Sequence, residues 1–278
     1  MPEIKSGLAD DAHPHRHDEF LRFQYGTRDQ IDVGAELGAT PARKQLLRAV
    51  RNSIIVELLQ MAWDDPSRWM AYARDKNWYS AAKFYIGPLG SHAATMWTIK
   101  TLVEADLIEH EKTRPSSKAK ARSRCRPTDR MLVDTPIRHV NQFQRVSSEP
   151  LRLKDRNKTL CPYRETKRTR SWRRNINAQN EVLAASVLQL NSSAWTANEH
   201  GLLCNGNRTL NPESKLYHRV FNVDWQHGGR WYGVFWQGLS GQDRGHLLID
   251  GQSVLEIDYP HLHPTLLAAG CGVDLGAE

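Results

Sequence analysis

The chain has 278 residues, enough for two domains or for one domain with extensions. Apolar residues make up 40% and charged residues 25%, which is polar for a globular protein but not typical of a disordered one. No apolar run reaches the roughly 20 residues that span a bilayer, and the polar N-terminus lacks a secretion signal. We therefore expect a cytoplasmic protein with no membrane partner. The four cysteines are far apart, which predicts neither a zinc site nor a disulfide framework.

The formal net charge of +7 is unevenly distributed. Residues 112–130 contain eight Lys or Arg against one acid, and residues 152–174 contain ten against two. Clustering of this kind favours a polyanionic partner, because each neutralised phosphate releases condensed counterions. DNA is the partner that we expect, with RNA as an open alternative. Solvated flexible linkers would have a similar composition.

Residues 1–41 are polar and predict a flexible tail. The apolar spacing then predicts a helix over residues 42–61, and Ser67 is placed to cap a short second helix through Arg74. A turn signal at residues 87–90 precedes a helix that Ser91 would cap. A short strand at residues 107–110, a basic loop at 112–122 and a return strand at 124–127 complete the segment.

This order resembles that of the winged helix-turn-helix family, most clearly at residues 97–112 and 122–131. The resemblance implies a nucleic-acid-binding domain at residues 42–133. The self-contained apolar helices, followed by a polar connector, predict that residues 42–130 fold as a unit without the C-terminal half. It places Ser91, His92, Thr95, Thr98 and Lys100 on or near the recognition helix. It makes wing residues of Lys112, Arg114, Lys118, Lys120, Arg122 and Arg124. The alternative is that the same fold serves as a packing or dimerisation module.

Residues 134–160 read as a basic connector. A helix is predicted from Trp172 to Leu190, followed by a loop with a hairpin signal at Asn205-Gly206. Tyr163 and Trp172 stand among basic residues, which suits stacking on single strands. They could equally be core anchors.

Near the C-terminus, Val254, Leu255 and Ile257 form an apolar run that follows the turn Asp250-Gly251 and ends at Asp258. One interpretation is that Asp258 caps a helix whose apolar face includes Leu266 and Leu267. The other is a carboxylate held at the end of a buried strand, as metal-dependent phosphoryl transfer requires.

The surrounding order resembles the palm region of family A DNA polymerases, on Gly229-Arg230, Gln237, Arg244, residues 256–259 and the leucines after them. The resemblance implies that Asp258 is catalytic and that Asp258 and Glu256 bind Mg²⁺ or Mn²⁺. It implies that Arg230, Gln237 and Arg244 contact template, primer or a nucleoside triphosphate. The family's Ser, Gln and Glu are replaced here by Pro260, His261 and His263. No counterpart of its later fingers helix or second carboxylate motif precedes Glu278, so we expect weak metal binding and very low synthesis.

Together these features predict an α+β protein with an N-terminal winged helix-turn-helix domain and a C-terminal partial polymerase-palm-like α/β module over residues 161–278. The expected function is DNA binding in replication, as in a phage or mobile element. The alternatives are an active template-dependent, DNA-directed nucleotidyltransferase and a winged-helix transcription regulator.

Overall fold

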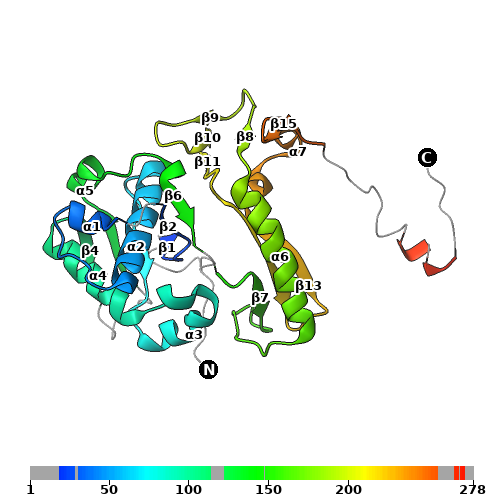
Figure 1. Cartoon of the computed structure of the whole chain (residues 1–278), viewed down its shortest axis with the longest axis horizontal. Helices are drawn as coiled ribbons and strands as arrows, with labels where there is room; N and C mark the ends of the chain where they lie inside the picture. The colour runs from blue at the N-terminus through cyan, green and yellow to red at the C-terminus, as the bar shows by residue number, and fades with distance from the viewer. Residues whose placement is uncertain are drawn as a thin grey trace.

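The computed structural model describes residues 19–28, 31–113, 122–146, 148–255, 266–268 and 270–272. These residues form a mixed α+β protein with several small sheets, as the sequence predicts. Figure 1 shows two lobes, which we call the N-terminal lobe (residues 19–146) and the C-terminal lobe (residues 148–255). Among the described residues, no helix has the length and apolar character needed to cross a membrane.

The N-terminal lobe is built around α2, which is buried on most sides because apolar residues occur all around it. Its sheet has the order β1-β3-β5-β4, with β1 parallel to β3 and the other pairs antiparallel. A separate antiparallel pair joins β2 to β6. The elements are β1 Glu19–Phe20, β2 Tyr25–Thr27, α1 Val33–Glu36, α2 Gln45–Asp64, β3 Met70–Tyr72, α3 Lys76–Ile86, the 3₁₀ helix η1 Gly87–Leu89, α4 His92–Glu104, β4 Ile108–Glu111, β5 Ser123–Pro127, α5 Asp129–Asp134, the 3₁₀ helix η2 Val140–Gln142 and β6 Phe143–Arg145.

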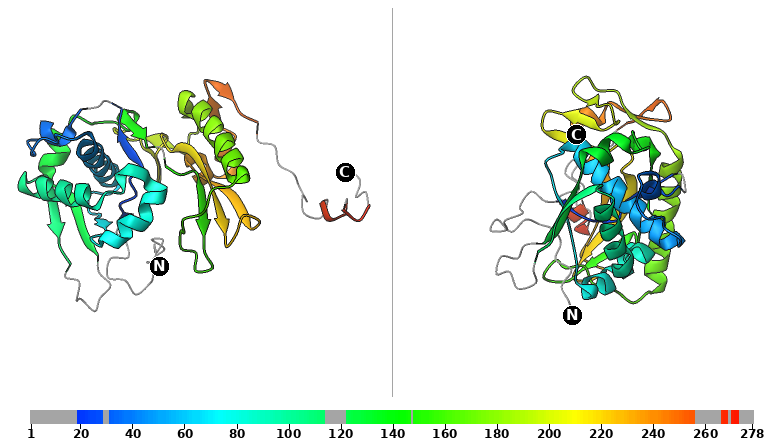
Figure 2. Two further views of the ribbon diagram at one scale, coloured as in Figure 1. Left: turned by 60° about the horizontal axis from the view of Figure 1, so that its bottom comes forward. Right: turned by 90° about the vertical axis from the view of Figure 1, so that its left-hand side faces the viewer.

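The C-terminal lobe has a sheet of order β13-β12-β7, and α6 crosses one face of it (Figures 1 and 2). Strand β7 is parallel to β12, and β12 and β13 form an antiparallel pair. Two smaller sheets have the orders β11-β10-β9 and β15-β14-β8. The elements are β7 Leu151–Lys154, α6 Lys167–Ala185, β8 Leu188–Leu190, β9 Thr196–Ala197, β10 Leu203–Asn205, β11 Arg208–Leu210, β12 Lys215–Asn222, β13 Gly228–Val234, the 3₁₀ helix η3 Phe235–Gly238, α7 Gly241–Arg244, β14 Leu247–Ile249 and β15 Gln252–Ser253.

Local signals placed several elements correctly. Ser91 caps α4 by accepting a hydrogen bond from the backbone N–H of Ala94. Asn205 ends β10 and Gly206 lies in the turn of the predicted hairpin, where its φ of 56° suits glycine. Asp250 and Gly251, with φ of 50° and 77°, form the turn between β14 and β15.

Four predicted boundaries were wrong. The segment at 67–74 contains β3 rather than a helix, because Met70–Tyr72 pairs with β1 and β5 and is buried throughout. The described part of the predicted tail contributes to the core through Leu21, Phe23, Tyr25, Val33 and Leu37. The helix predicted from Trp172 to Leu190 spans Lys167–Ala185 instead, since its last residues leave to pair with β14 as β8.

The fourth boundary concerns residues 134–160, which are not a connector. They include β6, which pairs with β2, and β7, which pairs with β12, 68 residues further along the chain. Both pairings satisfy backbone groups that a solvated linker would leave to water. The second basic stretch therefore begins inside a sheet, at residues 152–154, whereas most of the connection from β4 to β5 lies outside the described residues.

Candidate nucleic-acid interface

Helix α4 presents few of the residues that the sequence assigns to a recognition helix. Thr95 and Thr98 are fully buried, and Thr95 Oγ1 donates to the Ser91 carbonyl. His92 Nε2 lies 3.0 Å from the Arg74 carbonyl oxygen, and its ring packs edge-on against Tyr79. Lys100 is exposed and lies 3.6 Å from Glu104. Burial therefore removes Thr95 and Thr98 from the residues able to contact nucleic acid, because α4 packs on α2 through that face.

The basic connection between β4 and β5 begins and ends on well-packed strands. Arg124 Nε lies 2.9 Å from Glu111, and Arg126 Nη2 lies 2.7 Å from Glu109, while both guanidinium groups stack on Trp69. Arg122 stacks on Phe20, and burial lowers its pKa. Lys112 is exposed. Arg114, Lys118 and Lys120 lie outside the described residues. Arg124 is thus bound to its own hairpin, whereas Lys112 faces solvent.

The residues assigned by the polymerase resemblance lie on three separate elements. Arg230 is exposed on β13. Gln237 in η3 donates from Nε2 to the Trp231 carbonyl at 2.7 Å, and Arg244 at the end of α7 donates to the Leu239 carbonyl at 3.1 Å. Gln237 and Arg244 therefore make structural hydrogen bonds here.

The predicted carboxylate site lies at the edge of what the structure describes. Glu256, Ile257 and Asp258 fall outside the described residues. The predicted buried strand is not seen up to residue 255, because the strand β15 ends at Ser253 and Leu255 is 85% exposed. Leu266 and Leu267 are helical but exposed, so the expected apolar contact of that helix is also absent there. Among the described residues, no group of three His, Cys, Asp or Glu could hold a metal ion.

The face of the β7–β12–β13 sheet that α6 leaves uncovered is basic. Alternation along β7 puts Leu151 and Leu153 against α6, and Arg152 and Lys154 on the opposite face. The register pairs Val220 with both Arg152 and Arg230, and it pairs His218 with Tyr232. We call the residues on this uncovered side the basic face: Arg152, Lys154, His218, Arg230 and Tyr232.

Two arginines of the N-terminal lobe add their charge to the basic face. The pKa of Arg152 is lowered to about 10, first by burial and then by the charges of Arg145 and Arg22. The pKa of His218 is lowered to about 2 by burial and by the charges of Arg152, Arg145 and Lys154. Burial is the larger cause of both shifts, and the neighbouring cations add to it because they disfavour the protonated form. His218 is therefore a neutral imidazole among cations.

Gly233 and Tyr232 set the position of the His218 ring. The rings of His218 and Tyr232 stack with centroids 6.1 Å apart. Gly233 has a φ of 109°, and a Cβ atom there would lie 2.7 Å from His218 Nδ1. Only glycine therefore lets β13 pass this close to the imidazole.

The other side of the sheet explains the aromatic residues of the second basic stretch. Trp172 of α6 stacks on Phe221, and the Arg219 guanidinium lies over Trp172, Phe221 and Trp231. Tyr163 packs into the same cluster and donates to Glu149 at 2.8 Å. Tyr163 and Trp172 are therefore core anchors, as one of the two sequence interpretations holds.

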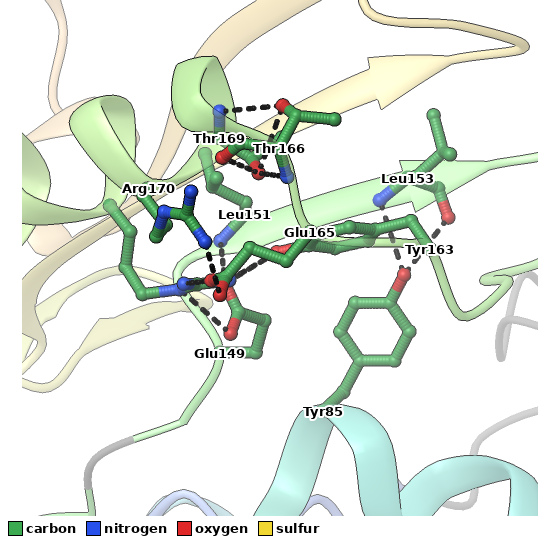
Figure 3. Close-up of polar contacts among 10 residues, drawn as sticks. Tyr85, Glu149, Leu151, Leu153, Tyr163, Glu165, Thr166, Thr169 and Arg170 are labelled. Carbon is green, nitrogen blue, oxygen red and sulfur yellow. Dashed lines mark hydrogen bonds and ion pairs between the residues drawn. The ribbon is translucent and has the colours of Figure 1, made fainter.

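Hydrogen bonds join the two lobes where α3 meets β7 (Figure 3). Tyr85 of α3 reaches β7, where its hydroxyl lies 3.3 Å from both the N–H and the carbonyl of Leu153. The Glu149 N–H donates to the Tyr85 carbonyl at 3.0 Å, and within the C-terminal lobe its carboxylate accepts from Tyr163, Arg173 and the Leu151 N–H. A pocket of about 350 Å³ lies in the N-terminal lobe, and its lining includes Gln45, Arg48, Asn52, Gln144 and Arg145.

Sequence reasoning missed Arg22, Arg145, Arg152, Lys154 and His218 as a group. One signal was present: Leu151-Arg152-Leu153-Lys154 alternates with the period of a strand that is buried on one side. The partners on β12 and near β2 could not be inferred, because these segments lie far away in the sequence.

Comparison with protein-family models, with curated proteins and with solved structures finds no match to this chain.

Proposed function

We propose that the protein binds DNA, with residues 45–127 as a winged helix-turn-helix and the connection between β4 and β5 as its wing. One observation carries this proposal: three helices and three strands follow the order α2, β3, α3, α4, β4, β5, and the strands form an antiparallel β3-β5-β4 sheet. That is the order of elements in a winged helix. The connection between its last two strands is strongly basic.

The buried face of α4 shapes the kind of DNA binding that we propose. Since Thr95 and Thr98 are inaccessible, α4 offers little for reading base edges. Phosphate contacts from Lys112 and from the basic residues up to Arg122 would then supply most of the affinity. The proposed activity is binding through the backbone, with strong salt dependence and weak sequence preference.

The test is a salt titration of duplex binding by the full chain and by the triple variant Lys118→Ala, Lys120→Ala and Arg122→Ala. We expect weaker binding and a log–log salt slope that is shallower by about one unit for each lost phosphate contact. The control is Arg43→Ala with Lys44→Ala, two exposed cations just before α2. The backbone N–H of the preceding residue, Ala42, donates a hydrogen bond to the side chain of Asp32, which caps α1. Arg130 of α5 donates to the Leu37 carbonyl at the end of α1, and α5 directly follows β5. The control cations are therefore near the end of the β4–β5 pair where β4 begins and β5 ends, and not near Glu111 and Ser123, which flank the connection. An unchanged slope in the triple variant would remove the wing from the binding surface.

The second proposal is that the C-terminal part of the chain is a partial polymerase-palm-like module, as the sequence resemblance implies. It is supported by the β7–β12–β13 sheet, which has a helix on one face and cations on the other, and by Arg230 on that second face. We expect very low nucleotide incorporation on a primed template with Mg²⁺ or Mn²⁺. Asp258→Ala is the matched variant. Robust incorporation that this substitution abolishes would establish the nucleotidyltransferase alternative, while incorporation that it leaves unchanged would exclude Asp258 from the chemistry.

A further inference from the structure

Within the part of the chain that the structure describes, no acidic side chain forms an ion pair with Arg152. Its Nε is buried and has no hydrogen-bond partner in the structure as described. No ion pair between described residues involves Arg152, Lys154 or Arg230, whereas the β4–β5 hairpin and α6 each contain two ion-paired arginines: Arg124, Arg126, Arg170 and Arg173. Burying a cation without a partner is costly, and such groups are usually paired or bind a ligand.

The neighbours of Arg152 make this cost larger. Arg145 comes from β6 and Arg22 from the segment between β1 and β2, so three different parts of the fold bring positive charge to one place. Arg145 stacks on Tyr25 and lies 3.4 Å from its hydroxyl, which fixes the guanidinium without neutralising it. Glu57 is close to Arg22, but no described carboxylate forms an ion pair with Arg145 or Arg152. Two neighbouring cations that lack an ion pair have the chemistry of an anion site.

We propose that Arg22, Arg145, Arg152 and Lys154 bind phosphate groups of a single-stranded nucleic acid, which then continues across the basic face. Two features favour a strand over an isolated phosphate. The positive charge extends across the sheet from β7 to Arg230 on β13. Tyr232 is 43% exposed on the same face and stacks on His218, so it offers a ring on which a base can stack.

This inference rests on the proposed function but concerns a second surface. The wing extends from the β4–β5 hairpin, whereas the basic face belongs to the C-terminal lobe. A protein with both surfaces would hold a duplex at the wing and a single strand between the lobes. The arrangement suits a junction between paired and unpaired DNA.

The experiment measures binding of a labelled oligothymidylate by fluorescence anisotropy, with the full chain. The variant is Arg152→Gln with Lys154→Ala. The control is Arg156→Ala with Lys158→Ala, which removes two charges from the exposed turn just after β7. We expect the first pair to weaken binding about tenfold and to reduce the salt slope by about 1.4, since each contact with a single strand contributes about 0.7. The control should change affinity less than threefold.

Two further arms make the result decisive. Arg152→Lys keeps the charge, so it should retain most of the binding and shows whether loss in the first variant reflects charge or misfolding. Competition with inorganic phosphate and with a nucleoside triphosphate identifies the ligand. Displacement of the oligonucleotide at equal phosphate concentration by either small anion would overturn the assignment to a strand. Oligothymidylate binding that survives in the Arg152→Gln, Lys154→Ala variant would overturn the site itself. Loss of duplex binding in the wing variant, with oligothymidylate binding intact, would show that the two surfaces act separately.

Discussion

The fold shifts the pKa of one carboxyl group, that of Glu57, away from its ordinary value. It lies in the middle of α2, and its carboxylate accepts hydrogen bonds from the backbone N–H groups of Arg22 and Gln24. Every second side chain from Leu21 to Tyr25 is buried in the core, and the N–H groups of the residues between them face α2. Burial raises the pKa of Glu57 to about 7, although both hydrogen bonds and the charge of Arg22 lower it.

The raised pKa of Glu57 predicts a pH-dependent stability. The folded state keeps the proton up to about pH 7, whereas the unfolded chain releases it near 4.5. The stabilisation is therefore complete below pH 4.5 and is lost as the pH rises through 7. Because the residue retains some contact with solvent, we expect a loss of about 1–2 kcal/mol in the free energy of unfolding between pH 5 and pH 8.

Glu57→Gln removes the titration and should flatten this part of the profile, as measured by urea unfolding at each pH. Glu36→Gln, which changes an exposed carboxylate on α1, is the control and should keep the profile of the parent chain. Equal pH dependence in the Glu57→Gln variant would mean that this carboxyl group is not the source.

At the scale of an element, the β12–β13 hairpin carries a strained connection. Val223 has a φ of 68°, a left-handed conformation that β-branched residues avoid, and its side chain is 49% exposed. Its N–H donates to the Lys154 carbonyl, which continues the pairing of β12 with β7 past the last strand residue. The hydrogen bond holds the backbone in a conformation that the side chain opposes.

Val223→Gly should therefore stabilise the protein by about 0.5–1 kcal/mol, because glycine adopts a positive φ without a steric penalty. Part of the gain is offset by the greater entropy of glycine in the unfolded chain. Thermal unfolding measures the difference. Val223→Ala keeps the Cβ atom and should give no comparable gain, so stabilisation by alanine would show that loss of the exposed apolar side chain is the cause.

For the whole molecule, the two lobes depend on each other more than the sequence suggests. Residues 191–214 extend from the C-terminal lobe onto the N-terminal one: His200 stacks on Trp63, Leu202 joins the main core, and Asn211 binds Gln60 at 2.9 Å. Arg28 pairs with Glu213 at 2.7 Å. The core around α2 also uses Phe23, Val140 and Phe143, all outside residues 42–130.

These contacts change the prediction that residues 42–130 fold alone. Without the flanking strands, the helix α2 would expose apolar surface that the core needs, so we expect no cooperative unfolding of that fragment. Residues 19–146 retain β2 and β6 and should unfold cooperatively, with lower stability than the full chain because Leu202 and His200 are missing. Circular dichroism during urea titration compares the two fragments. Cooperative unfolding of 42–130 would restore the original domain boundary.

Sequence alone determined the features that depend on neighbouring residues. Ser91 caps α4 because its side chain accepts a hydrogen bond from a nearby backbone N–H. The turns at Asn205-Gly206 and Asp250-Gly251 form because glycine readily adopts a positive φ. The helical spacing of α2 and the basic composition between β4 and β5 are equally local. Such signals predict that an element exists and where it turns, because the energy involved lies within a few residues.

Only the tertiary structure decided which distant segments meet. Met70–Tyr72 became a strand because β1 and β5 lie on either side of it. Burial beneath a segment 33 to 35 residues away raises the pKa of Glu57, against the lowering effect of two hydrogen bonds from that segment. The basic face required β7 to pair with β12 and Arg145 to approach from the other lobe. Burial and charge interactions depend on distance in space, and no pattern within one segment specifies its partner across the chain.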